Sequence, residues 1–251
     1  MTTFAPTPVA RHAARDTDTP PTRWWTPAVL PGGWTRLLLV AVAGIVALHV
    51  VVSLLATSVE DFPGLDPAVR LFDMDEERGL PAWFSTLLLA AVAQALWLLA
   101  RQSARSGRAR WVRHEQGLAV VFAYLSLDEM VSLHEQTITP LRRALDLEGI
   151  LAFSWVLLFV PLALAVAVLS LGWLRSLPLQ AVRLVVLAGA LYVGGAAGVE
   201  LAGAGLMDAG RVDTMAYQLT VVVEEVAEIA GALLMLSVVT WLRLRPEPLH
   251  D

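Results

Sequence analysis

The sequence predicts an all-α fold: a polytopic membrane bundle of six transmembrane helices. Hydrophobic residues make up 57% of the 251 residues, and the mean hydropathy is +0.63. A soluble domain is less apolar, because its helices need a polar face. The chain also contains six apolar stretches, each of about 20 residues or more, which is the length that crosses a bilayer. Arginine content alternates between successive loops, as expected when a chain crosses a membrane repeatedly.

The predicted domain organisation is simple. Residues 1–33 are rich in proline, threonine, alanine and arginine and have little apolar pattern, so we expect a disordered cytoplasmic tail. The six-helix transmembrane domain covers residues 34–243, and residues 244–251 form a short cytoplasmic tail. The expected spans are residues 34–58, 81–100, 115–138, 150–174, 181–207 and 217–242.

Arginine distribution predicts the orientation of the chain. The chain has no lysine, and 13 of its 18 basic residues lie in the tail together with Arg36 just after it, the 101–113 loop, the 175–183 loop and the C-terminus. The three alternate loops hold the other five arginines together with 11 acidic residues. Positively charged loops stay in the cytoplasm, so both termini are expected there, in a bacterial plasma (inner) membrane. With no cysteine, disulfides and thiolate metal sites are excluded.

The fourth and fifth spans differ in composition. Residues 150–174 contain no ionisable side chain, so this span is expected to face lipid. Residues 181–207 are rich in glycine, and small residues let membrane helices approach closely. Gly194 and Gly198 form a Gly-x-x-x-Gly pair, which we expect to pack against a neighbouring helix on a face away from Glu200.

The third span carries ionisable groups where hydrocarbon is expected. Asp128, Glu129, His134 and Glu135 lie within ten residues of one another. Such groups inside a bilayer cost several kcal/mol each unless they are paired, protonated or bound to a cation. On one continuous helix, Asp128 and Glu135 would share a face with Ser132. That face therefore requires partners from other spans.

The other spans supply further acids but few bases. Counting residues from the loops places these groups between the midplane and the outer surface of the bilayer. No arginine lies in the interior of a span, so salt bridges cannot neutralise the acids, and protons or a cation must do so. His49 is better explained as a packed histidine, and Glu129 and Glu225 as locally paired. The acids are Asp128, Glu129, Glu135, Glu200, Glu224, Glu225 and Glu228, against His49 and His134.

We interpret the cluster as a site for a divalent metal ion. Carboxylates with one or two histidines suit iron or manganese, or zinc when carboxylates are fewer. Asp128 is expected to act as the catalytic general base or to orient a ligand. The acidic outer segment Phe72–Glu77 is better explained as a solvated loop, and the alternative is a cation-attracting mouth or a second metal site. The predicted ligands are His134, Glu135, Glu200, Glu224 and Glu228.

Several segments together carry a family resemblance, namely residues 72–77, 81–85, 126–129 with 133–135, and 224–228. They resemble a family of uncharacterised multi-pass bacterial membrane proteins over most of residues 60–231. The acidic segment before Trp83-Phe84-Ser85, with the later Asp128 and Glu129, is also similar to the alkaline ceramidases and related intramembrane metal hydrolases. That family has seven spans and His-x-x-x-His in the last one. This chain has Glu-Glu-x-x-Glu there, so the resemblance transfers no zinc ligand.

Three functions fit these observations. The first is a metalloenzyme, an oxidoreductase or hydrolase, acting on a lipid or another apolar small molecule. The second is a pathway for protons or cations through the same acids. The third is an accessory membrane subunit whose buried acids order the bundle or bind a partner helix. A nucleic-acid partner is not expected, since the arginine-rich 101–113 loop is explained by topology and anionic lipid.

Overall fold

The structure is a computed structural model that describes residues 34–58, 64–147, 149–212 and 214–245, and every regular element in these residues is helical. The predicted tail 1–33 lies outside the described residues, as do residues 246–251 of the C-terminal tail. Four described helices are long and apolar enough to cross a membrane, and a fifth candidate is a pair of helices bent by 77°. The length and composition of these helices fit a helical membrane protein, and the number of six spans stays a prediction.

The helices follow the predicted spans closely, apart from the third. The first helix, α1, begins and ends at the expected residues. The last helix, α9, is 30 residues long, carries three glutamates in its first half and is not among the four apolar helices. The elements are α1 Trp34–Ser58, α2 Leu65–Phe72, α3 Leu80–Arg105, α4 Ala109–Val131, α5 Leu133–Leu145, the 3₁₀ turn η2 Gly149–Ala152, α6 Val156–Arg175, α7 Leu179–Val193, the π-helical η3 Gly194–Val199, α8 Glu200–Asp208 and α9 Met215–Leu244.

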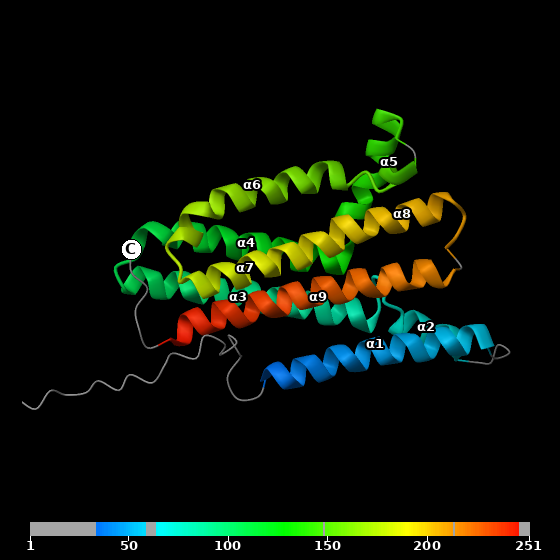
Figure 1. The fold of residues 1–251 in the computed structure, drawn as a ribbon, viewed down its shortest axis with the longest axis horizontal. Helices are drawn as coiled ribbons and strands as arrows, with labels where there is room; N and C mark the ends of the chain where they lie inside the picture. The colour runs from blue at the N-terminus through cyan, green and yellow to red at the C-terminus, as the bar shows by residue number, and fades with distance from the viewer. Residues whose placement is uncertain (1–33, 59–63, 148, 213, 246–251) are drawn as a thin grey trace, which may run out of the picture.

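Helices α3 and α9 form the centre of the bundle. Helix α3 packs against α4 and α9, and α9 packs in turn against α7 and η3. Figure 1 shows these long helices lying side by side, with α7, η3 and α8 following one another along a single rod. Leu96, Trp173, Val238 and Val239 are fully buried between them. Inside a membrane such a core is held by close side-chain packing, because lipid is as apolar as leucine.

Helices α1 and α6 lie at the periphery and expose apolar side chains. Val40 and Leu54 on α1 are 68% and 55% exposed, and Val168 and Leu169 on α6 are 64% and 73% exposed. A continuous apolar surface of this kind is unfavourable in water and favourable against acyl chains. The exposed face of α6 agrees with the expectation that residues 150–174 face lipid, whereas Trp155 and Trp173 in the same range are buried.

Glycine packing differs from the expectation. Gly194 and Gly198 have no neighbouring atom within 4 Å of the place that a Cβ would occupy, so the predicted packing face is wrong. The close contact is made one residue later, where a Cβ on Gly195 would lie 2.9 Å from the Glu224 carbonyl oxygen. The π-helical stretch rotates the glycines relative to a regular helix, which a spacing rule does not anticipate.

The two ends of the bundle carry different loops. One end holds α2, α5 and the α8–α9 turn, and the other holds the α3–α4 and α6–α7 turns and the end of α9 (Figure 1). At the second end, buried Arg108 lies 3.4 Å from buried Glu115, which also accepts a hydrogen bond of 3.2 Å from Trp173 Nε1. This buried pair ties the α3–α4 turn to α6.

Candidate metal centre

A break at Ser132 shapes the site. Helix α4 ends at Val131, and Ser132 has a left-handed conformation with φ of 53°, so α5 leaves at 77° to α4. The prediction of one continuous helix over residues 115–138 is therefore wrong, and Asp128 and Glu135 do not share a helical face. Asp128 Oδ1 accepts a 2.9 Å hydrogen bond from the backbone N–H of His134. This bond satisfies one of the free N–H groups that begin α5, because those groups have no partner within the helix.

The same aspartate also holds the His134 ring. Asp128 Oδ2 lies 2.9 Å from His134 Nδ1. In the tautomer that carries its hydrogen on Nδ1, the N–H donates a hydrogen bond to the carboxylate, and Nε2 is left as the nitrogen that can bind a metal. On another side, the Trp155 ring packs edge-on against the imidazole with centroids 5.0 Å apart. The ring is therefore fixed by two neighbours before any ligand binds.

A third residue reaches this region from the acidic loop between α2 and α3. His49 on α1 is buried and anchors this loop, because its Nδ1 accepts the Met74 N–H at 3.1 Å. The same nitrogen lies 3.3 Å from Asp73 Oδ1. The loop then turns tightly at Gly79, where a Cβ would lie 3.0 Å from the Glu76 carbonyl oxygen. The bond to Met74 agrees with His49 as a packed histidine, and the turn directs Glu77 towards α5.

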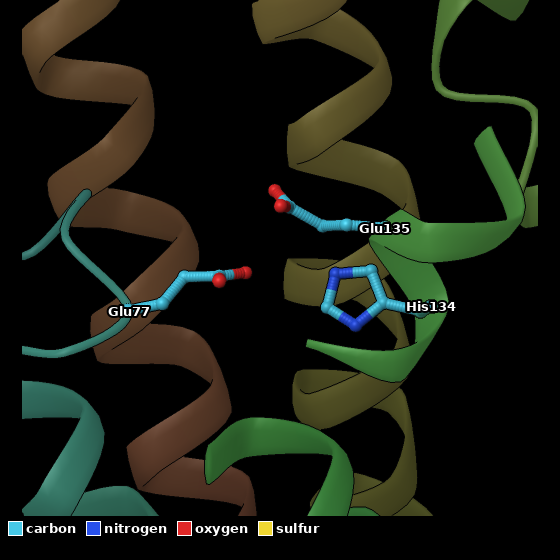
Figure 2. A group of neighbouring side chains, drawn as sticks. All are labelled: Glu77, His134 and Glu135. Atoms are coloured by element: carbon cyan, nitrogen blue, oxygen red, sulfur yellow. The ribbon is translucent and has the colours of Figure 1, made fainter. Parts of the chain in front are cut away.

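Glu77, His134 and Glu135 form one group. Each offers a ligand atom, and these atoms all lie within 4.8 Å of one another. Figure 2 shows the Glu77 carboxyl pointing across a gap at the imidazole and at the Glu135 side chain. Glu77 and Glu135 also line an open hollow of about 310 Å³, together with Arg78, Val131, Ser132 and Gln136. Two carboxylates and one imidazole are a donor set that would suit iron, manganese or zinc.

Charges in the loop favour a positive ligand. Burial raises the pKa of Glu77, and the nearby Glu135 charge raises it further. Burial and the Asp73 charge likewise raise the pKa of Asp75, although its side chain retains access to solvent. The pKa of Asp73 is instead lowered, chiefly by the neighbouring His49 side chain. A cation bound at Glu77 therefore competes with a proton that this carboxyl holds more tightly than an isolated glutamate does.

The other predicted ligands lie around this group rather than in it. Glu200 accepts a 3.0 Å hydrogen bond from Trp155 Nε1, so it connects to His134 through the indole. Among the described residues, Glu224 and Glu228 on α9 do not join the three-residue group. Glu224 is an electrostatic neighbour of Glu200, and the Glu228 side chain packs against Gly195. Glu200 on α8 and Glu224 and Glu228 on α9 thus lie outside the Glu77–His134–Glu135 group.

Glu77 was not among the ligands predicted from the sequence. It is separated from His134 by more than 50 residues, and only the acidic composition of residues 72–77 hinted at a cation site there. Its side chain reaches the group because the His49 anchor and the Gly79 turn fold the loop over the start of α5. Neither contact has a recognisable sequence spacing.

Comparison with known proteins gives a family but no activity. No curated protein and no solved structure matches the chain. The similarity to alkaline ceramidases therefore remains a prediction. A family model described as a domain of unknown function, DUF8692, matches residues 37–242, a range that includes Glu77, Asp128, His134 and Glu135. Because this match spans most of the sequence, the chain belongs to that family.

Proposed function

We propose that this chain is a membrane metalloenzyme that holds a divalent ion on Glu77, His134 and Glu135 and acts on a lipid or another apolar small molecule. The observation that carries the proposal is the convergence of these three side chains, with Asp128 bonded to the far side of the imidazole. A carboxylate behind a histidine ligand is a common arrangement at metal sites, because it fixes the ring and raises the basicity of the nitrogen.

The donor set narrows the choice of metal and reaction. Two carboxylates and one neutral imidazole fit iron, manganese or zinc. When bound, such an ion polarises a substrate oxygen or activates water, or supports redox chemistry if it is iron or manganese. A metal-dependent hydrolase or oxidoreductase is therefore the proposed enzyme class. Asp128 orients His134, while Trp155 and Glu200 limit rotation of the ring.

We further infer six spans, with both termini in the cytoplasm and the group near the outer surface of the plasma membrane. The separation of loops between the two ends of the bundle supports this orientation (Figure 1). The end that holds the group also holds the acidic 73–79 loop, and the opposite end holds the arginine-rich 101–113 segment. Arginine-rich loops remain on the cytoplasmic side.

A specific observation favours one alternative, a proton or cation pathway. Glu225 and Glu228 on α9 are electrostatic neighbours of Glu129 on α4, so acids continue from the group into the bundle. A pathway needs such a succession of ionisable groups. Ion uptake into proteoliposomes discriminates the two functions. Uptake that Glu228→Gln abolishes favours the pathway, whereas wild-type vesicles without uptake favour the enzyme.

Metal content tests the proposal directly. Wild-type protein, a Glu77→Gln/Glu135→Gln double variant and a Glu76→Gln control are purified in detergent and loaded in turn with Mn²⁺, Fe²⁺ and Zn²⁺. We expect ~1 equivalent of at least one metal in the wild type and the control, and less than ~0.2 in the double variant, because a single imidazole holds an ion weakly. Elemental analysis after desalting gives the stoichiometry. Wild-type protein that retains none of the three metals contradicts the proposal.

A further inference from the structure

One cationic side chain lines the hollow beside the proposed metal ligands. Arg78 follows Glu77 directly and contributes to the same hollow as Glu77 and Glu135. Its side chain is exposed, and it makes no ion pair within 4.0 Å with any carboxylate in the part of the chain that the structure describes. This is unexpected in a segment that also contains Asp73, Asp75 and Glu76. The guanidinium is therefore available to an external anion.

Charge balance makes anion binding conditional on the metal. Without an ion, the two carboxylates outweigh Arg78, and the hollow repels anions. A divalent ion on the group would cancel the charges of Glu77 and Glu135 and leave Arg78 as the one charged residue of the hollow's lining that the ion does not neutralise. An anion in the hollow would then contact the ion on one side and the guanidinium fork on the other. Arginine binds phosphate oxygens in pairs, so this geometry favours phosphate over a monoatomic anion.

The surroundings of the hollow are apolar on the α4 side. Val131 lines the hollow and is 44% exposed, and Met130 and Leu127 next to it on α4 are 60% and 52% exposed. The hollow itself, at about 310 Å³, is at the lower end of the ~300–1,000 Å³ typical of small-molecule sites. It therefore accommodates a headgroup but not two acyl chains, which would lie along α4 in the bilayer.

From these observations we infer that the substrate is an anionic lipid whose phosphate headgroup lies between Arg78 and the metal ion, with its acyl chains against α4. This inference rests on the proposed metal site and names the class of molecule that the site takes. Ser132 and Gln136 supply neutral polar groups on the remaining wall of the hollow. Free inorganic phosphate shares the headgroup chemistry, and only the apolar surface of α4 distinguishes the two ligands.

Binding of short-chain ligands tests the inference. Wild-type protein, Arg78→Gln and Arg142→Gln are loaded with Mn²⁺, and their affinities for dioctanoyl phosphatidate, inorganic phosphate and dioctanoylglycerol are measured by calorimetry in detergent. Arg142 is the control, because it is an exposed arginine at the same end of the bundle and does not line the hollow. We expect phosphatidate to bind best. Arg78→Gln should weaken that binding roughly tenfold or more, since a charge-assisted paired hydrogen bond is lost.

The possible failures are distinguishable. Wild-type protein that takes up no metal overturns both the proposed function and this inference. Metal uptake with unchanged phosphatidate affinity in Arg78→Gln, or with equal affinity for dioctanoylglycerol, overturns the inference alone. Inorganic phosphate that binds as tightly as phosphatidate excludes the lipid as the recognised ligand. Metal-free wild-type protein should bind none of the three ligands. Strong binding of phosphatidate or phosphate to the metal-free protein would contradict the charge argument.

Discussion

At the scale of single residues, Asp128 has two roles at the start of α5. One carboxylate oxygen accepts the His134 backbone N–H, and the other lies 2.9 Å from the ring nitrogen Nδ1. The residue therefore fixes both the position of the main chain and the orientation of the imidazole. The sequence predicted that Asp128 would act as a general base or orient a ligand, and the geometry supports the second role.

Replacing Asp128 by asparagine should weaken metal binding without unfolding the chain. The amide still accepts the backbone bond but no longer offers a charged oxygen to Nδ1, so the ring is held less firmly and its nitrogen is less basic. We expect the metal affinity to fall about 10- to 100-fold, the usual effect of losing such a partner. Titration against a metal-binding dye measures the affinity. Asp146→Asn, an exposed change at the other end of α5, should leave the affinity unchanged.

At the scale of elements, the α4–α5 break and the α7–η3–α8 rod account for most of the difference between expectation and structure. The positions of the apolar helices follow from hydropathy, because span length and composition are local properties of the sequence. The break at Ser132 does not follow, since no glycine or proline marks it and a serine with positive φ is uncommon. Glu77 was missed for a related reason: a contact across more than 50 residues depends on tertiary packing.

Helix packing around α9 gives a prediction at this scale. A Cβ on Gly231 would lie 2.7 Å from the Ala188 carbonyl oxygen and 2.8 Å from the Tyr192 nitrogen, so α7 and α9 would have to separate. Gly231→Ala should lower the free energy of unfolding by about 1–3 kcal/mol, as overpacking usually does. Denaturant titration in detergent micelles, followed by tryptophan fluorescence, measures this change.

The matched control for this change is Gly189→Ala. No atom lies within 4 Å of the place that its Cβ would occupy, and it lies in α7, the helix against which Gly231 of α9 packs. The same substitution there should leave stability unchanged or raise it by up to ~1 kcal/mol, because alanine favours a helix. An equal decrease in the free energy of unfolding in both variants would show that the close contact at Gly231 is not the cause of the destabilisation.

At the scale of the whole molecule, charge is divided between the two ends of the bundle. The acidic 73–79 loop lies at the end that holds the candidate metal centre, and the α3–α4 turn, part of the arginine-rich 101–113 segment, lies at the opposite end (Figure 1). This division was predictable from the sequence, because loops alternate in composition. The convergence of Glu77 with His134 and Glu135 was not, since it depends on how α1, α2 and α5 pack at one end.

Single-cysteine labelling tests the orientation. The chain has no cysteine, so one can be introduced without a background signal. Arg211→Cys lies in the α8–α9 turn and Ser106→Cys in the α3–α4 turn, and both positions are exposed. A membrane-impermeant maleimide added to intact bacterial cells should modify the first and spare the second until the cells are permeabilised. The reverse labelling pattern would place the candidate metal centre on the cytoplasmic side.

The Glu77–His134–Glu135 group is formed by two segments: the loop that precedes α3 and the start of α5, just after the α4–α5 break. At the proposed metal site, a nascent polypeptide therefore brings its three ligand residues together only after α5 has formed and the loop has packed against the start of that helix. Chains that have entered the bilayer but not assembled would retain every donor residue and still fail to capture an ion. Ion occupancy of the proposed site would thus measure completed tertiary assembly, independently of any catalytic assay.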